Sequence, residues 1–166
     1  MNEAPVLSFR PAATDDAAHV ASLVQRTFTS NHVPGWSIES LRSIHDANSV
    51  EALVGSFSEA SYQSVAVLDK QIIGYISFAK PHLLSIVAVD AAHHGQGIGS
   101  SLLRDAIDVV EKANPALEVL QVNATERSQP FYAKHGFYPI SPMINVLDRR
   151  FMRMAMWLRP RRMGWA

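Results

Sequence analysis

The sequence predicts a mixed α/β fold with an antiparallel first half and one strand–helix–strand crossover. Three observations carry this prediction: a hairpin pattern in the middle of the chain, a nearly all-apolar run after it, and an amphipathic helix that follows directly. In the helix the apolar residues Ile98, Leu102, Ala106 and Val110 recur at every fourth position. A chain of 166 residues supports one hydrophobic core, so we expect a single domain over residues 1–166.

Composition argues against several classes of function. The chain has 15 basic and 15 acidic side chains, so no strong attraction to nucleic acid or to an anionic membrane is expected. It has no cysteine, which excludes a disulfide framework, a thiolate nucleophile and a zinc–thiolate site. No segment resembles a secretory signal or the roughly 18 apolar residues of a membrane span. We therefore expect a cytoplasmic protein with no membrane or nucleic-acid partner.

The N-terminal part of the sequence predicts one strand and two helical regions. Val6 to Arg10 has the pattern of a short strand, and Thr14 with the aspartates after it is typical of a helix cap. A turn-like stretch, 31–35, separates the first helix from a second helical region. That region starts at Ser37, and its apolar spacing continues through Phe57.

Strand patterns dominate the middle of the sequence. Val65 to Leu68 and Ile72 to Phe78 are strand-like, and Asp69-Lys70 between them predicts a tight turn of an antiparallel hairpin. Pro81 ends the hairpin. Leu83 to Val89 is nearly all apolar, which indicates a central strand covered on both faces.

The C-terminal part predicts two helices and two strands. The helix after the apolar strand ends near Asn114, and Leu117 to Val122 is expected to be a buried strand. A short helix is predicted over Phe131 to His135, with Gly136 as its C-terminal stop. Phe151 to Leu158 is rich in Met and predicts a closing strand.

Three glycines, Gly95, Gly97 and Gly99, lie between the apolar strand and the amphipathic helix. Such a turn directs free backbone N–H groups and the positive end of a helix toward one point, which favours an anion such as phosphate. A tight connection that only requires positive φ is the alternative. No lysine follows Gly99 as a Walker loop requires, and the glycine spacing does not fit a dinucleotide fingerprint. We therefore expect another kind of phosphate-bearing ligand.

Three segments resemble the GNAT superfamily of N-acyltransferases. VAVDAAHHGQGIGSSLL is similar to its acyl-CoA signature, which falls here on His94, Gly97 and Gly99, with His94 where Arg or Gln is usual. LQVNATERSQPFYAKHGF resembles its later motif, and FRPAATDDAAHVASLVQRTF its first strand and helix. The resemblance covers essentially the whole chain. It implies one N-acetyltransferase domain with a mostly antiparallel central sheet flanked by helices, in which a splayed strand pair holds CoA.

The resemblance also implies which residues contact acetyl-CoA. The backbone of the strand before the glycines would bind the pantetheine arm, and the amides of the turn would surround the pyrophosphate. Asn123 would bond the pantetheine or a structural water, although a turn-forming asparagine is an alternative. The expected contacts are Val87, Ala88, Val89, His94, Gly95, Gln96, Gly97, Ile98, Gly99, Ser100, Asn123 and Tyr132.

Transfer to an amine requires a proton acceptor and a proton donor, because an alkyl amine titrates at about 10 and a thiol at about 8.5. Tyr132 matches the superfamily tyrosine that faces the CoA sulfur and is the candidate general acid; a tyrosine that only packs a short helix is the alternative. Ser85 falls about where many members have Glu, and this chain has none there. His82, at the start of that strand, is the named candidate base, and a solvated strand-end histidine is the alternative.

Loops build the acceptor pocket in this superfamily and give no code for a substrate. His32 and Trp36 are the candidate substrate contacts, and an ordinary loop with one buried aromatic is the alternative. Loops at 80–84 and 141–150 are expected to contribute. No metal site is expected, because the paired histidines at 93–94 would diverge and no metal-binding motif accompanies them.

The sequence thus predicts an enzyme that moves the acetyl group of acetyl-CoA directly to a primary amine of a small molecule or peptide. A non-catalytic acyl-CoA-binding module, which senses CoA charge or regulates a partner, is the alternative. A third interpretation is a longer acyl donor such as succinyl-CoA. The closing strand also leaves open an exchange with a second subunit, which would make a homodimer.

Overall fold

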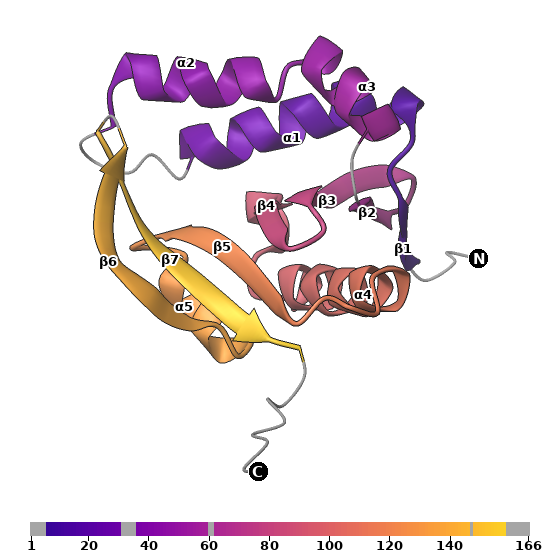
Figure 1. Cartoon of the computed structure of the whole chain (residues 1–166). Coiled ribbons are helices and arrows are strands. Elements are labelled where there is room, and N and C mark those ends of the chain that lie inside the picture. Colours follow the sequence, from indigo (N-terminus) through magenta and orange to yellow (C-terminus); the bar gives the residue numbers. More distant parts are fainter. Residues whose placement is uncertain (1–5, 31–35, 60–61, 147, 159–166) are drawn as a thin grey trace.

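A seven-stranded sheet organises the described residues, which are 6–30, 36–59, 62–146 and 148–158 of the computed structural model. The strand order is β1-β2-β3-β4-β5-β7-β6, and only β4 and β5 run parallel. Figure 1 shows the strands β1 (Leu7–Pro11), β2 (Tyr62–Leu68), β3 (Gln71–Lys80), β4 (Leu83–Val89), β5 (Val119–Thr125), β6 (Tyr138–Val146) and β7 (Arg149–Trp157). The helices are α1 (Ala17–Ser30), α2 (Ile38–Ala47), α3 (Val50–Glu59), α4 (Ile98–Ala113) and α5 (Gln129–Lys134), with short 3-10 turns η1 (Thr14–Asp16) and η2 (Ala91–His93).

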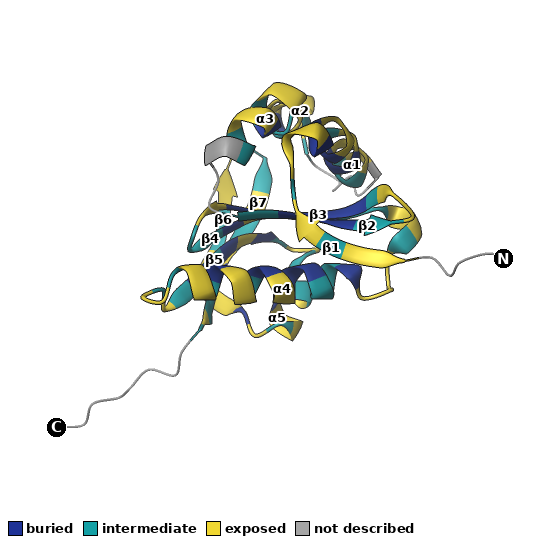
Figure 2. Cartoon of the chain, turned by 90° about the vertical axis from the view of Figure 1, so that its right-hand side faces the viewer, coloured by how far each residue is buried: buried dark blue, intermediate teal, exposed yellow. Residues whose placement is uncertain are grey.

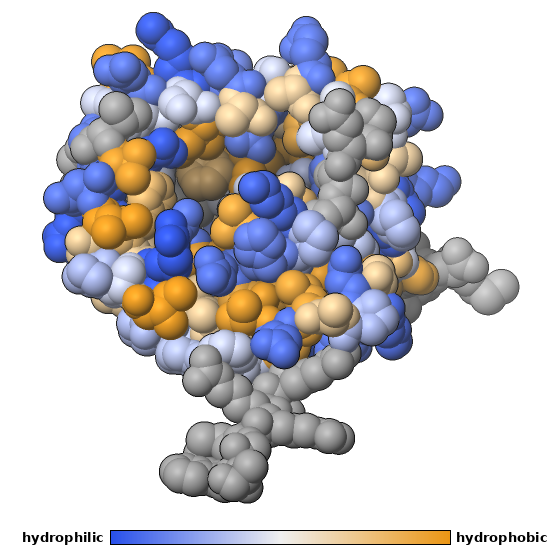
Figure 3. All heavy atoms as spheres, in the orientation of Figure 1, coloured by the Kyte–Doolittle hydropathy of each residue, from blue (hydrophilic) through white to orange (hydrophobic). Residues whose placement is uncertain are grey.

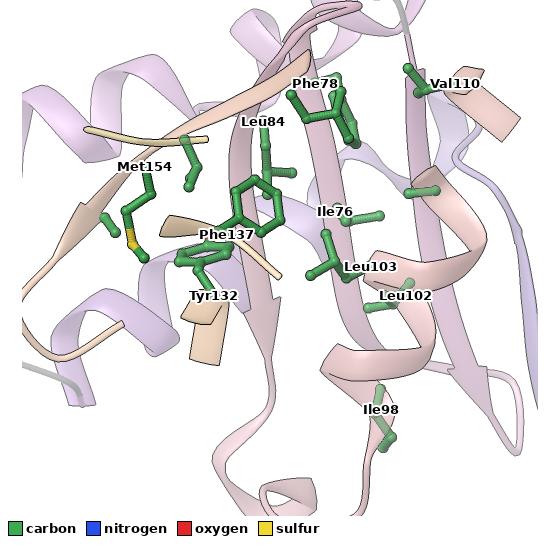
Figure 4. Packing of buried hydrophobic residues seen from close by; sticks show 14 of the residues in the cluster. Ile76, Phe78, Leu84, Ile98, Leu102, Leu103, Val110, Tyr132, Phe137 and Met154 are labelled. Carbon is green, nitrogen blue, oxygen red and sulfur yellow. The ribbon is translucent and has the colours of Figure 1, made fainter. Parts of the chain in front are cut away.

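Helices cover both faces of the sheet. Figure 2 shows α1, α2 and α3 on one face and α4 and α5 on the other. The buried apolar side chains form two clusters. Leu102 and Phe137 belong to the larger one, which joins the sheet to α4 and α5 (Figure 4), and Leu23 and Leu53 belong to the one beneath α1 and α3. The predicted mixed fold with a mostly antiparallel sheet is confirmed. In the described part of the chain, none of the helices combines the length and apolar composition needed to cross a membrane.

Several predicted boundaries are confirmed by backbone geometry. The β2–β3 hairpin closes on Asp69 and Lys70, whose φ angles of 47° and 68° place both in the left-handed region that a type I′ turn requires. The helix after the glycines spans Ile98 to Ala113. Gly136, with φ of 88°, follows the short helix α5 and ends it as predicted.

The second helical region is two helices and not one continuous segment. α2 ends at Ala47, and Asn48 caps it by donating from its side-chain Nδ2 and its backbone N–H to the carbonyl of Ile44, at 2.8 and 3.2 Å. The hydroxyl of Ser49 then accepts a hydrogen bond from the N–H of Ala52 at 3.3 Å, in the first turn of α3. Such local bonds to the backbone favour a helix end, and apolar spacing alone does not reveal them.

Asp16, and not Thr14, stabilises the start of the first helix. The N-cap position is Ala13, which has no side chain that can cap. The Asp16 carboxylate accepts the Ala13 N–H at 2.8 Å and pairs with both terminal nitrogens of Arg10, at 2.6 and 2.8 Å. This ion pair links β1, which contains Arg10, to the first helical turn, which contains Asp16. Asp16 is only 8% exposed, so the link lies at the edge of the core.

The expectation of a loop over 141–150 is wrong, because β6 occupies much of that segment. β6 pairs antiparallel with β7, which begins at Arg149. It contains Pro139 and Pro142, and the pairing is irregular after Pro139. A central strand could not accommodate these prolines, but β6 lies at the edge of the sheet, where one row of N–H groups needs no partner.

Candidate active site

Strands β4 and β5 separate soon after they begin. Only two residue pairs join them, Leu83 with Gln121 and Leu84 with Val122. On its other side, β4 remains paired with β3 to its end. The backbone groups of β4 that face β5 beyond this point therefore have no strand partner. The expectation that both faces of this strand are covered is confirmed, because Leu84 packs into the cluster beside α4 and Ala88 into the cluster beneath α1. Only Ser85 of β4 is exposed.

The glycine turn lies between the end of β4 and the start of α4. Gly95 and Gly97 have φ angles of 75° and 79°, and a Cβ added to either would point into open space. The N–H of Ser101 donates to the carbonyl of Gly97 at 3.0 Å. The N–H groups of residues 98–100 have no partner among the described residues, and they lie at the positive end of the helix dipole. This geometry suits an anion.

Helix α5 packs against the turn. A Cβ on Gly99 would meet the Phe131 ring at 3.5 Å, and the Ser100 hydroxyl is 2.9 Å from Nε2 of His135. Burial lowers the pKa of His135, and the nearby positive charge of Lys134 acts in the same direction. The His135 imidazole is therefore neutral at pH 7, and it fixes the start of α4 against α5.

Tyr132 comes from the same short helix and is 6% exposed. Its ring packs edge-on against Phe131, with the ring centroids 5.2 Å apart. It packs in the same way against Phe137, at 5.6 Å (Figure 4). Among the described residues none forms a hydrogen bond with its hydroxyl. Burial raises the pKa of Tyr132 above its ordinary value of 10.0. The hydroxyl therefore keeps its proton through the neutral range and is available as a donor.

A cavity of about 940 Å³ joins the separated strands, the glycine turn and Tyr132. Figure 3 shows this face of the molecule hollowed, with hydrophobic side chains inside the hollow. Most of the predicted site residues line the cavity: Trp36, Val87, Val89, His94, Gly95, Gly97, Ile98, Gly99, Ser100, Asn123 and Tyr132. Segments that are far apart in the sequence thus meet around one space.

Other predicted residues lie elsewhere. Ala88 belongs to the core beneath α1, and Gln96 is exposed outside the cavity lining. His82 lies in the turn before β4, at the end where β4 and β5 are still paired, and its carbonyl accepts the N–H of Gln121 at 2.7 Å. His32 is outside the described residues. The roles assigned to these residues stay predictions.

Two predicted contacts are held by bonds within the chain. Nε2 of His94 donates to the carbonyl of Val89 at 2.8 Å, so its ring folds back on the end of β4. The side-chain oxygen of Asn123 accepts a hydrogen bond from Nε of Arg153 at 3.5 Å. Within the described part of the chain no three His, Asp or Glu side chains form a group suited to a metal ion.

Another part of the cavity combines aromatic rings with an arginine. The rings of Phe28 and Trp36 stack with their centroids 6.5 Å apart. The guanidinium carbon of Arg149 lies 5.9 Å from the Trp36 ring and 5.5 Å from the Phe151 ring, within cation–π range. All four residues line the cavity. Of these, sequence analysis named only Trp36; the spacing of two between Arg149 and Phe151, which puts both on one face of a strand, was the available signal.

The fold and the cavity define a class of protein with a mixed, mostly antiparallel sheet and a large cavity beside two diverging strands. Residues 24–158 match the family model described as the acetyltransferase (GNAT) domain, so the chain belongs to the GNAT family of acetyltransferases. The resemblance noted in the sequence is thereby confirmed. A comparison with curated proteins gives no match.

Solved structures of GNAT acetyltransferases share the fold. A GCN5-related N-acetyltransferase from Rhodopseudomonas palustris superposes with a TM-score of 0.77 at 21% identity, covering 91% of this chain and 95% of that one. The PaiA N-acetyltransferase from Thermoplasma acidophilum, in complex with coenzyme A, gives 0.77 at 16% identity, covering 92% and 99%. A GNAT acetyltransferase from Brucella melitensis, in complex with acetyl-CoA, gives 0.66 at 19% identity, covering 93% and 90%.

Proposed function

We propose that this chain is an N-acetyltransferase that moves the acetyl group of acetyl-CoA directly to a primary amine of a small molecule or peptide. The observation that carries the proposal is the cavity itself, which unites an anion-binding turn, an open strand edge and a buried tyrosine hydroxyl. Two structural neighbours in complex with coenzyme A or acetyl-CoA support the choice of donor. A cytoplasmic location and a homodimer stay predictions of the sequence.

The residues present fit acetyl-CoA. The open space beside Gly95 and Gly97 leaves room for a pyrophosphate, and the N–H groups of residues 98–100, which are unpaired among the described residues, follow directly at the start of α4. The backbone of Val87 and Val89 lies at the strand edge that β5 leaves unpaired, where an amide-rich pantetheine arm can bond. Acetyl-CoA supplies the activated acetyl group.

The chain's own groups then have defined tasks. Transfer forms an amide C–N bond, breaks the thioester C–S bond, removes one proton from the amine and delivers one to the departing thiolate. The Tyr132 hydroxyl is proposed to donate the proton to the departing thiolate, because burial raises its pKa and keeps it protonated at neutral pH. His82 remains the proposed base. His82→Gln is therefore expected to reduce the rate more at about pH 6 to 7 than at about pH 9. At the higher pH more of the amine is already deprotonated and needs no base.

Calorimetric titration with acetyl-CoA tests the proposed acetyl-CoA site, which we call the cradle and which consists of the glycine turn and the open edge of β4. Dephospho-CoA and ATP are the controls. Gly97→Asp places a carboxylate in the open space of the turn and is expected to weaken acetyl-CoA binding by about tenfold or more. Gly97→Asn is the matched control, because asparagine has the same size and meets the same positive φ without the charge. It is expected to retain more affinity than Gly97→Asp.

Turnover separates this proposal from a non-catalytic binding module. Release of CoA in the presence of an amine, with formation of the acetylated product, supports the transferase. Acetyl-CoA binding without turnover on any amine would favour the sensor or regulatory module. Equal binding of acetyl-CoA by the wild type and Gly97→Asp would show that the glycine turn does not bind acetyl-CoA.

A further inference from the structure

Arg149 occupies a part of the cavity that the transfer chemistry above does not use. Its side chain is partly buried, and its Nε is fully buried. Within the described part of the chain its guanidinium has no hydrogen-bond or ion-pair partner, and Nε is one of the buried side-chain atoms left unsatisfied. Nε is covered by protein atoms, whereas the two terminal nitrogens are not among the buried atoms and have no partner in the described part of the chain. A ligand in the cavity is the natural source of acceptors for these terminal nitrogens.

The surroundings hold this guanidinium in place. It lies over the rings of Trp36 and Phe151, at 5.9 and 5.5 Å, and both rings line the same cavity. Cation–π contacts orient the planar group without occupying its N–H donors. Arg149 is therefore positioned as a fork with free donors at the cavity wall.

The charge of the cavity lining points to the kind of ligand. Its described lining contains the cationic side chains of Arg127, Lys134 and Arg149 and no Asp or Glu. The one carboxylate next to Arg149, that of Asp148, bonds instead to Ser37 and Ser40 of the α2 start. An acceptor that carried only an ammonium group would meet positive charges with nothing to offset them. An acceptor with its own carboxylate would satisfy them.

We propose that the acceptor amine also carries a carboxylate, as a free amino acid does, and that Arg149 binds this carboxylate through paired N–H donors. The inference rests on the proposed transferase function and names its substrate class. Arg–carboxylate pairs are commonly bidentate, which would fix the amine relative to the Tyr132 side of the cavity. Arg149 is thus a specificity-determining residue.

The test compares amines that differ only in the carboxylate. The twenty standard amino acids and β-alanine are screened for CoA release, and the best of them is compared with its α-amide, with its decarboxylated amine and with O-phosphoethanolamine. We expect the amino acid to be acetylated and the amide and the decarboxylated amine to react at least about tenfold more slowly, the size expected for losing a charged hydrogen bond.

Variants then assign the preference to Arg149. Arg149→Gln is expected to raise KM for the amino acid by about tenfold to a hundredfold, with a smaller effect on kcat, and to leave the affinity for acetyl-CoA unchanged. Arg149→Lys keeps the positive charge but lacks the planar pair of donors. Its KM for the amino acid is expected to lie between those of the wild type and Arg149→Gln. Arg150→Gln is the matched control, because Arg150 is exposed and pairs with Glu126 at 2.8 Å. Circular dichroism and thermal unfolding of each variant exclude a folding defect as the cause.

The outcomes separate this inference from the function on which it rests. Equal rates for the amino acid and its decarboxylated amine, a preference for O-phosphoethanolamine, or an unchanged KM in a folded Arg149→Gln protein would each overturn the carboxylate inference while leaving the transferase intact. Binding of acetyl-CoA with no reaction on any amino acid would also overturn it. A wild type that does not bind acetyl-CoA would instead refute the transferase proposal, and the inference with it.

Discussion

The carboxylate of Asp148, at the start of the β7 arm of the last hairpin, accepts a hydrogen bond from the hydroxyl of Ser40 in α2. The same carboxylate accepts the backbone N–H of Ser37 just before that helix. These bonds lower the pKa of Asp148, with the Ser40 bond as the largest cause. Trp36 directly precedes Ser37 and Arg149 directly follows Asp148, and the two side chains meet in the cavity. The contact therefore positions the proposed acceptor site.

Asp148→Ala is expected to loosen that site without touching the acetyl-CoA cradle. The prediction is a KM for the acceptor raised by about threefold or more and an unchanged calorimetric affinity for acetyl-CoA. Asp108→Ala is the control, because Asp108 is an exposed residue on α4. An Asp148→Ala enzyme with the wild-type KM would show that the contact does not position the acceptor site.

The ion pair between Arg10, which is partly exposed, and the buried Asp16 predicts a pH-dependent contribution to stability. The hydrogen bonds from Arg10 are the largest cause of the lowered pKa of Asp16, whose ordinary value is 3.8. A lowered pKa in the folded state means that the contribution is fully present above pH 3.8 and is lost as the pH falls through the still lower folded value. Asp16→Asn should therefore reduce the free energy of unfolding at neutral pH by about 1 to 2 kcal/mol, a range that allows for the exposure of Arg10.

Urea unfolding of the wild type, Asp16→Asn and the exposed control Asp15→Asn measures this effect. The difference between the wild type and Asp16→Asn should shrink as the pH is lowered from about 7 toward about 3. A difference that stays constant over that range would mean that the charge of Asp16 is not its cause.

Tyr132→Phe tests the proton donor with little structural cost, because the phenylalanine ring keeps the packing against Phe131 and Phe137. We expect kcat to fall by about a hundredfold, as is common for loss of a general acid, with acetyl-CoA affinity within about twofold of the wild type. Tyr138→Phe on the exposed edge strand is the control. Since the pKa of Tyr132 lies above 10.0, the wild-type rate should show no loss of this acid below that pH. Full activity in Tyr132→Phe would dismiss the role.

Gly74→Ala is expected to destabilise the protein, because Gly74 lets α4 approach β3 closely. A Cβ there would lie 2.8 Å from Leu102, 3.1 Å from Ala66 and 3.3 Å from Ile98, all of them buried. Overpacking of this kind costs about 1 to 3 kcal/mol in urea unfolding. Gly55→Ala in α3 is the matched control, since its Cβ would meet nothing within 4 Å, and it should leave stability equal or raise it by up to about 1 kcal/mol. Equal stabilities for Gly74→Ala and the wild type would show that the neighbouring side chains move aside at no cost in stability.

The amino-acid sequence alone predicted the features that local chemistry controls. The Asp69-Lys70 hairpin, helix α4 and its glycine turn, and the Gly136 stop all follow from the spacing and type of neighbouring residues, because backbone dihedrals and apolar periodicity are set within a few positions. The same local signals failed for β6, whose prolines are typical of a loop until the strand is known to lie at the sheet edge.

Only the tertiary structure decided how the site is assembled. The divergence of β4 from β5 depends on pairing between separate segments, and Ser37 meets Asp148 from 111 positions away. No local pattern encodes such contacts, because they form only when the whole core packs. The sequence therefore determined the glycine turn that suits an anion, whereas the packing of distant segments decided that Trp36 and Arg149 share a cavity with it.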